Sequence, residues 1–368
     1  MPDTTDRPTA RALEWLHRLL AECAKRSASD LFLKTDAPPS MRVDGSVTFL
    51  PGQRVPATAM EQVAAGVLGP RFETFRARGE ADLAYEAPEA GRFRVNVFRQ
   101  RSTVSIAFRH IPSRVPSFEA LNLPVKQLTH LAEQKRGLVL VTGVTGSGKS
   151  TTLAAIVDYI NTNFPRHVIT IEDPIEFIHR DKRGLIEQRE VGLDTESFAS
   201  GLKHVVRQSP DVILIGEMRD QETIQTAINA AEIGHLVLST LHTATAMQTL
   251  ERIVGYFPPH QHELVRTQLA NTMQGILSQQ LLVRADGRGR VPAVEVMMRA
   301  PTICELIQKG EVLKLPAAMR EDTYFGSETY HEALVRLHRA GTITMAEALG
   351  ATGRPQELRN ELQGLTVG

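Results

Sequence analysis

A complete phosphate-binding loop near the middle of the chain is the feature that most restricts its fold. Residues 143–150 read G-V-T-G-S-G-K-S, they follow the apolar run 138–141, and the helix-forming segment 151–157 comes after them. This strand–loop–helix setting is what the motif requires, because its glycines let successive N–H groups converge on phosphate oxygens at a helix N-terminus. A glycine-rich turn before an ordinary helix is the alternative.

The motif also predicts roles for individual residues. The Lys149 ammonium group should reach the β- and γ-phosphates of a nucleotide, and the Ser150 hydroxyl should help to hold Mg²⁺. The residues expected to bind the nucleotide are Gly143, Val144, Thr145, Gly146, Ser147, Gly148, Lys149, Ser150 and Thr151.

The composition argues against several other classes of protein. Lysine plus arginine and aspartate plus glutamate both number 42, so the formal net charge is zero and gives no pull towards nucleic acid. The two cysteines, Cys23 and Cys304, suit a reducing compartment and offer no metal framework. No apolar run reaches the roughly 18 residues of a membrane span, and the polar N-terminus has no signal-peptide pattern. We expect a cytoplasmic protein without direct membrane insertion.

The first third of the chain mixes a helix with short strands. Apolar residues at positions 13, 16, 19, 20 and 23 have helical spacing, and Asp44-Gly45 between the short runs 41–43 and 47–49 is typical of a β-hairpin. Residues 93–98 and 104–109 alternate as strands do. These patterns predict an α+β domain over residues 1–112, built on an antiparallel sheet, and a linker rich in proline and serine at 113–120.

Beyond the linker, short apolar runs alternate with helical segments. The expected strands are 138–142, 168–171, 212–215 and 236–240, and the expected helices are 151–161, 198–207 and 222–231. This order predicts a parallel α/β sheet in a core of residues 121–300. Residues 301–368 read as mostly helical, and the T-M-A-E sequence from Thr344 to Glu347 predicts a capping box that opens the last helix.

Acidic residues follow the second expected strand of this core. Glu172, Asp173 and Glu176 lie around Pro174, which ends the strand, so they belong to a loop at the edge where α/β sheets bind ligands. One carboxylate could orient or deprotonate a water molecule, and others could hold Mg²⁺ through water. A solvated acidic turn is the alternative.

The next two expected strands end in further polar residues. Glu217 follows the strand 212–215 after Gly216 and is a candidate for supporting the metal, although it could instead be an acid that caps a helix before Asp220. His242 follows the strand 236–240 and could donate a hydrogen bond to the γ-phosphate, with a purely structural histidine as the alternative.

Arginines are concentrated in the first domain. Nucleotide hydrolases often need an arginine that neutralises charge on the phosphoryl group, and no arginine in or beside the phosphate loop is an obvious candidate. A strand-borne arginine from another domain or subunit could supply it, and a solvated basic strand face is the alternative. These arginines are Arg92, Arg94, Arg99, Arg101 and Arg109.

Together these motifs resemble those of the secretion-superfamily ATPases, and most closely the PilT/PilU-type motors of type IV pilus retraction. Residues 141–155 match the Walker A motif, 170–177 the Asp box, 188–191 a Q-R-E-V segment, 215–220 an atypical Walker B motif and 240–243 the His box. The resemblance extends from about residue 12 to about residue 350. The extension ATPases carry an additional N-terminal domain and usually a tetracysteine site, and from the length and the two cysteines of this chain we expect neither here.

The resemblance implies a RecA-like P-loop ATPase domain joined to an N-terminal PAS-like α+β domain and a helical C-terminal tail, assembled as a homohexamer. It implies that ATP and Mg²⁺ are bound, that Glu176 is the catalytic glutamate and Glu217 the Walker B acid, and that Arg94 and Arg109 reach the nucleotide. Glu172 and His242 complete the expected catalytic set. The implied partner is a PilC-like platform protein, and the implied location is the cytoplasmic side of the inner membrane at the pilus base.

Three alternatives stay open from the sequence. Residues 301–310 and 341–349 look more like the PilU type, which implies an accessory ATPase acting beside a paralogous one. A RecA-like nucleic-acid motor would need a basic groove and stacking aromatic residues, yet aromatic residues make up only 5% of the chain. A nucleotide-gated assembly protein with no motor role is the third.

Overall fold

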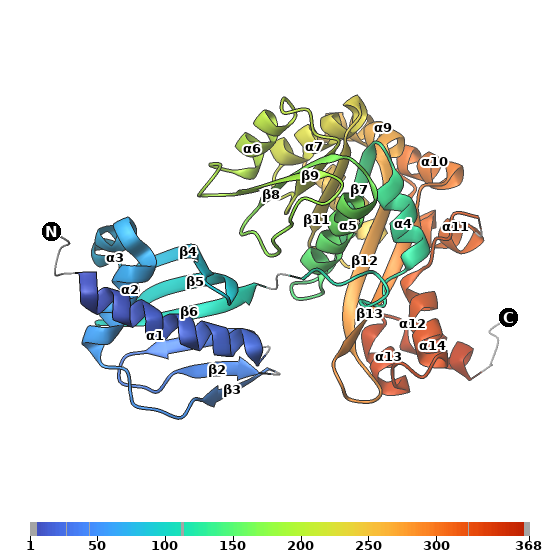
Figure 1. Ribbon diagram of the computed structural model, residues 1–368. Coiled ribbons are helices and arrows are strands. Elements are labelled where there is room, and N and C mark those ends of the chain that lie inside the picture. Colours follow the sequence, from blue (N-terminus) through green and yellow to red (C-terminus); the bar gives the residue numbers. More distant parts are fainter. Residues whose placement is uncertain (1–5, 27, 44, 112–113, 323, 364–368) are drawn as a thin grey trace. The chain divides into compact units, whose positions relative to one another are not determined.

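The computed structural model describes residues 6–26, 28–43, 45–111, 114–322 and 324–363. The chain divides into two compact units. The first unit comprises Met1–Arg114 and Glu176–Ile178, and the second comprises Val115–Ile175 and His179–Gly368. Each unit has its own sheet (Figure 1), and each has its own hydrophobic core.

The first unit is built on a six-stranded antiparallel sheet in the order β3-β2-β1-β6-β5-β4. Helices α1 and α2 pack on it, and their apolar side chains share a core with Phe93 and Phe108. Val43 of β2 pairs with Ser46 of β3, which confirms the predicted hairpin, although Asp44 itself lies outside the described residues. The elements are α1 (Asp6–Lys25), β1 (Asp30–Lys34), β2 (Ser40–Val43), β3 (Ser46–Phe49), α2 (Ala57–Leu68), α3 (Phe72–Arg78), β4 (Glu80–Ala87), β5 (Gly91–Gln100) and β6 (Thr103–Ile111).

The second unit contains a seven-stranded sheet in the order β13-β12-β7-β11-β10-β8-β9. The four predicted strands form its centre and are parallel, whereas β13 pairs antiparallel with β12, so the sheet is mixed rather than purely parallel. The elements up to β13 are α4 (Val125–Glu133), β7 (Gly137–Thr142), α5 (Lys149–Asn163), β8 (His167–Glu172), β9 (Leu185–Glu190), α6 (Phe198–Val205), β10 (Val212–Ile215), α7 (Gln221–Ile233), β11 (Leu236–Leu241), α8 (Ala246–Gly255), α9 (His262–Thr272), β12 (Met273–Val283) and β13 (Arg290–Met298).

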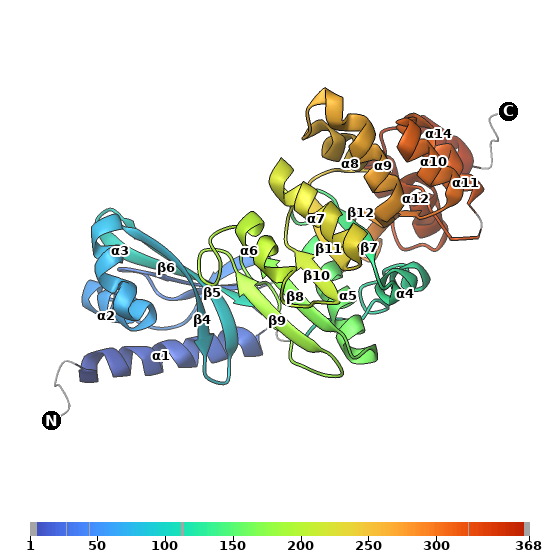
Figure 2. The same cartoon turned by 90° about the horizontal axis from the view of Figure 1, so that it is seen from above.

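Helices cover both faces of this sheet (Figure 2). Alternate residues of β7, such as Leu138 and Leu140, share a core with α7, α8 and α9, while Val139 and Val141 share another with α4 and α5. Because both faces are buried, the central strands read as continuous apolar runs, which explains why they were predictable.

The elements after β13 form a helical region. Its helices are α10 (Pro301–Lys309), α11 (Leu315–Glu321), α12 (Tyr330–Arg339), α13 (Met345–Ala351) and α14 (Pro355–Leu362). In this region α12 packs on β13 and α10 packs on α9. Within the described ranges, no helix has the length and apolar character needed to cross a bilayer.

The predicted capping box at Thr344 is wrong in two respects. Thr344 does cap α13 by accepting a hydrogen bond from the Glu347 N–H, but α14 follows, so α13 is not the last helix. The Glu347 carboxylate accepts instead from the Val283 N–H at 2.8 Å, because the end of β12 offers it a competing donor. A complete capping box occurs at α12, between Thr329 and Glu332.

Candidate nucleotide site

The phosphate loop connects the end of β7 to the start of α5. Gly143, Gly146 and Gly148 have φ angles of 145°, 78° and 90°, which side chains rarely tolerate. A Cβ atom on Gly143 would lie 2.3 Å from the Gln279 carbonyl oxygen and 2.5 Å from Ser147 Oγ, so only glycine fits there. The loop backbone is therefore curled as the motif predicts.

Polar groups gather inside this loop. Lys149 is 9% exposed, and its Nζ donates hydrogen bonds to the carbonyl oxygens of Gly143 at 2.9 Å and Val144 at 3.1 Å. Ser147 Oγ is buried and has no hydrogen-bond partner in the part of the chain that the structure describes. A concave loop with a cation at its mouth and a buried unsatisfied hydroxyl fits a bound phosphate. The Ser150 side chain is exposed beside it, where it could hold Mg²⁺.

Gln279 of β12 supports the loop and is not among the residues predicted from the sequence. Its Nε2 donates to the Ser147 carbonyl oxygen at 2.6 Å, and its Oε1 accepts from the Thr152 hydroxyl at 2.9 Å. One amide thus ties the loop to the first turn of α5. The available signal was a polar amide inside the mostly apolar run of β12.

The ends of β10 and β11 bring Glu217 and His242 together. His242 Nε2 lies 3.3 Å from Glu217 Oε1, and Arg219 Nε donates to Glu217 Oε2 at 2.8 Å. Helix α7 is capped by Asp220, which accepts from the Thr223 N–H, so the alternative reading of Glu217 as a capping acid is wrong. Glu217 is 18% exposed and shielded by its partners.

The carboxylates of the Asp box differ in their surroundings. Glu172 Oε1 accepts hydrogen bonds from the Thr170 hydroxyl at 2.7 Å and from Gln188 Nε2 at 3.1 Å. Its backbone also lies beside β10, because a Cβ atom on Gly216 would be 3.4 Å from Glu172 Cα. Glu176 is exposed and belongs to the short segment that groups with the first unit.

The two arginines singled out by the resemblance are direct neighbours on the sheet of the first unit. Arg94 of β5 pairs with Arg109 of β6, and both side chains are exposed. Arg109 Nε donates to Asp30 Oδ1 at 3.1 Å, and Arg42 Nε lies 3.3 Å from Asp30 Oδ2. Asp30 is 6% exposed, so a buried carboxylate orients the Arg109 side chain, which is itself 69% exposed.

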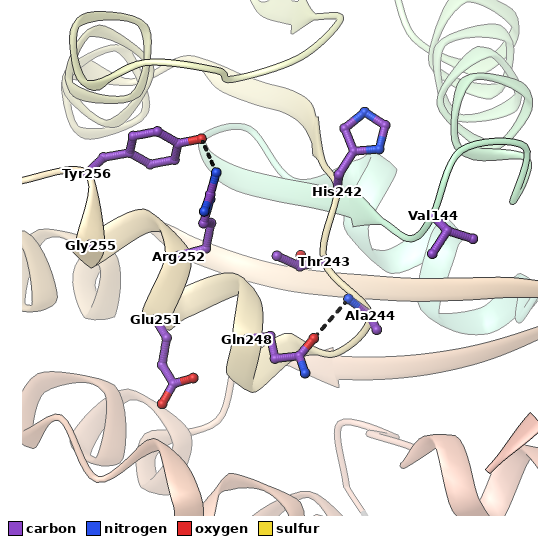
Figure 3. Close-up of a pocket in the computed structure, with 9 residues that line it drawn as sticks. All are labelled: Val144, His242, Thr243, Ala244, Gln248, Glu251, Arg252, Gly255 and Tyr256. Atoms are coloured by element: carbon purple, nitrogen blue, oxygen red, sulfur yellow. Dashed lines mark hydrogen bonds between the residues drawn. The ribbon is translucent and has the colours of Figure 1, made fainter. Parts of the chain in front are cut away.

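A cavity of about 800 Å³ lies between the tip of the phosphate loop and α8 (Figure 3). Arg252 donates to the Tyr256 hydroxyl at 3.3 Å along one wall, and the Ala244 N–H donates to Gln248 at 3.2 Å on another. The residues around it are Val144, His242, Thr243, Ala244, Gln248, Glu251, Arg252, Gly255 and Tyr256. His242 therefore has open space beside the loop that would hold the γ-phosphate.

Comparison with protein families gives the same assignment as the motifs. The family model of type II/IV secretion system proteins matches residues 9–323, which is most of the chain. The chain belongs to this family.

Within the described residues, no group of three or more His, Cys, Asp or Glu side chains is arranged to hold a metal ion by itself.

Two similar relatives within the family are pilus ATPases. The type IV pilus ATPase PilU of Pseudomonas aeruginosa is 43% identical over 346 residues, covering 93% of this chain and 90% of PilU. The retraction ATPase PilT of the same organism is 42% identical over 337 residues, covering 90% of this chain and 96% of PilT. A crystal structure of the pilus retraction motor PilT with bound ADP matches with a TM-score of 0.87 and 42% identity, covering 94% of this chain and 98% of that one. The predicted resemblance to PilT/PilU-type ATPases is confirmed.

Proposed function

We propose that this protein is an ATP-hydrolysing motor that powers retraction of type IV pili and so supports twitching motility. One observation carries the proposal: the phosphate loop and His242 line the same cavity, and His242 Nε2 lies 3.3 Å from Glu217 Oε1, in a chain of the type II/IV secretion system family. The 42% identity to PilT extends over nearly the whole of both chains, and so includes the parts outside the nucleotide site.

The side chains support a division of labour in hydrolysis. The loop N–H groups, Ser147 Oγ and Lys149 would hold the β- and γ-phosphates, and Mg²⁺, held by Ser150 and through water by Glu217, would neutralise their charge. Glu176 would accept a proton from the attacking water, with Glu172 fixed nearby by its two hydrogen bonds. His242 would donate a hydrogen bond to the γ-phosphate.

The wider assignment follows from the same family. We assign residues 1–112 to a PAS-like domain, 113–120 to a linker, 121–300 to a RecA-like ATPase core and 301–368 to a helical region. The motor would work as a homohexamer in the cytoplasm, docked on a PilC-like platform protein at the inner membrane, with Arg94 and Arg109 reaching the nucleotide. Movement between the two units would transmit hydrolysis to the pilus.

Gene deletion tests this function directly. Labelled pili should still extend in the deletion strain but should not retract, so cells should become hyperpiliated and lose twitching. Bald cells would contradict the proposal, because they would indicate an extension motor. If retraction continues until a paralogous ATPase is also deleted, the protein is an accessory motor of the PilU type.

A further inference from the structure

A buried carboxylate on β13 contacts the first turns of two helices. Glu295 is 7% exposed, and its Oε1 accepts a hydrogen bond from the Ala246 N–H at 2.7 Å. Its Oε2 accepts from the Tyr330 N–H at 3.4 Å. Ala246 and Tyr330 are the first residues of α8 and α12. The first N–H groups of a helix lack intrahelical partners and carry a partial positive charge, so one anion here satisfies donors of both helices.

The two helices lead to different parts of the second unit. Helix α8 begins directly after the loop that carries His242, and it borders the cavity beside the phosphate loop (Figure 3). Helix α12 belongs to the C-terminal region, and the strand-like segment before it joins β13 through two backbone hydrogen bonds of 2.8 Å between Val296 and Glu328. Glu295 therefore links the His242 loop to the C-terminal helices.

The sheet register places Glu295 in line with the nucleotide site. Glu295 pairs with Ser278 of β12, and Ser278 pairs with Thr142, the last residue of β7 before the phosphate loop. Thr142 pairs in turn with Leu241, the last residue of β11 before His242. The Thr142 hydroxyl donates to Ser278 Oγ at 2.9 Å, so a row of side chains crosses the sheet from the two catalytic loops to Glu295.

We propose that Glu295 is a positioning residue that holds the N-terminus of α8, and with it the His242 loop, in a fixed relation to the C-terminal helices. Burial raises the pKa of the Glu295 carboxyl group, while the N–H groups of Ala246 and Tyr330 act in the opposite direction by favouring the charged form. Its expected effect on catalysis rests on the proposed ATPase function, whereas its effect on the helices does not.

The test compares Glu295→Gln with Thr329→Ala, each as full-length protein. A glutamine keeps the shape but offers one acceptor, so its NH₂ group must face a second N–H donor. Thr329→Ala removes the cap of α12 alone and is the matched control. For Glu295→Gln we expect kcat to fall roughly tenfold, the scale of one charged hydrogen bond, with the Kd for ATP changed by less than about threefold.

Hydrogen exchange gives a readout that needs no catalysis. Glu295→Gln should speed amide exchange at the first turns of both α8 and α12, whereas Thr329→Ala should speed it at α12 only and leave kcat unchanged. A second variant, Thr245→Ala, removes the side-chain cap of α8 and should lower kcat without affecting α12.

Three results would overturn the proposal. They are unchanged exchange at α8 in Glu295→Gln, turnover of Glu295→Gln within about threefold of wild type, and a loss of kcat in Thr329→Ala as large as in Glu295→Gln. If the wild-type protein hydrolyses no ATP at all, the proposed function fails, and the exchange data alone then decide whether Glu295 holds both helices.

Discussion

The phosphate loop concentrates its positive charge in one side chain. Lys149 Nζ is held by two carbonyl oxygens at the loop mouth, where the β- and γ-phosphates of ATP would lie. Lys149→Ala removes that fixed cation, so ATP hydrolysis should be lost while the protein stays folded. A steady-state phosphate-release assay measures this. Turnover within about threefold of wild type would contradict the assignment.

Two glutamates of the Asp box compete for the role of general base, and their surroundings differ. Glu176 is exposed and can approach a water molecule, whereas the Glu172 carboxylate accepts hydrogen bonds from Thr170 and Gln188. Glu176→Gln should still bind ATP but turn over at least ~10²-fold more slowly, the usual scale for a lost base. Glu172→Gln should show a smaller loss, because its amide can keep one of the two bonds. The reverse order of these two effects would mean that Glu172 is the base.

A histidine beside the Asp box should make stability depend on pH. Burial lowers the pKa of His179 from 6.5 to about 4, and in the described part of the chain its Nδ1 has no hydrogen-bond partner. The unfolded chain therefore binds more protons than the folded chain between these pH values. The contribution of neutral His179 to the free energy of unfolding should be present in full above pH 6.5. It should be lost as the pH drops towards 4, which lowers the free energy of unfolding by on the order of 3 kcal/mol.

The measurement is the melting temperature of wild type and of His179→Gln at pH 7 and at pH 5. The variant cannot gain a proton at this position, so its melting temperature should fall less between the two pH values. His204→Gln, which replaces an exposed histidine on α6, is the control and should respond like wild type. Equal losses in wild type and His179→Gln would show that His179 is not the titrating group.

At the scale of secondary-structure elements, β12 supports the nucleotide site from outside the predicted motifs. Gln279 on this strand holds both the Ser147 carbonyl oxygen and the Thr152 hydroxyl. Gln279→Ala leaves both groups without this partner, each at a cost of roughly 1–3 kcal/mol, so the Kd for ATP should rise about tenfold or more.

The neighbouring Gln280 is the control for this prediction. It is exposed and accepts a hydrogen bond from the Tyr330 hydroxyl, away from the phosphate loop. Titration with a fluorescent ATP analogue should show weaker binding for Gln279→Ala and near-normal binding for Gln280→Ala. The same affinity in both variants would mean that β12 does not stabilise the loop.

Some elements could be predicted from the sequence because their signal is local. The strands β7, β8, β10 and β11 are apolar runs, and a helix directly follows β7, β10 and β11. The phosphate loop has a fixed sequence pattern. The outer strands β9, β12 and β13 were not predicted. Strand β9 is largely polar and β12 carries three glutamines, so neither of these two shows a clear period. Gln279 offered only the weak signal of a polar amide in a mostly apolar strand, and the roles of Gln279 and Glu295 could not be predicted, because each acts on segments far away in the sequence.

At the scale of the whole molecule, the arginines and the phosphate loop belong to different units. Arg94 and Arg109 pair on the sheet of the first unit, whereas Lys149 begins α5 of the second. A separate domain presents such a side chain more easily to a neighbouring subunit's nucleotide than to a site beyond its own linker. In a ring of identical subunits every site would then be shared between two chains through a heterologous contact.

A mixing experiment tests this shared site. Arg94→Ala or Arg109→Ala should bind nucleotide almost normally yet hydrolyse it ~10³-fold or more slowly, the scale for an arginine that stabilises a phosphoryl transition state. Lys149→Ala is inactive for a different reason, because its loop fails while its arginines are intact. When the two inactive variants exchange subunits, some sites combine an intact loop with intact arginines from the other chain, so ATPase activity should reappear and be greatest at intermediate mixing ratios. Differently tagged subunits verify that mixed rings have formed. If ATPase activity in those samples shows no gain at any mixing ratio, a site completed by a neighbouring chain is ruled out.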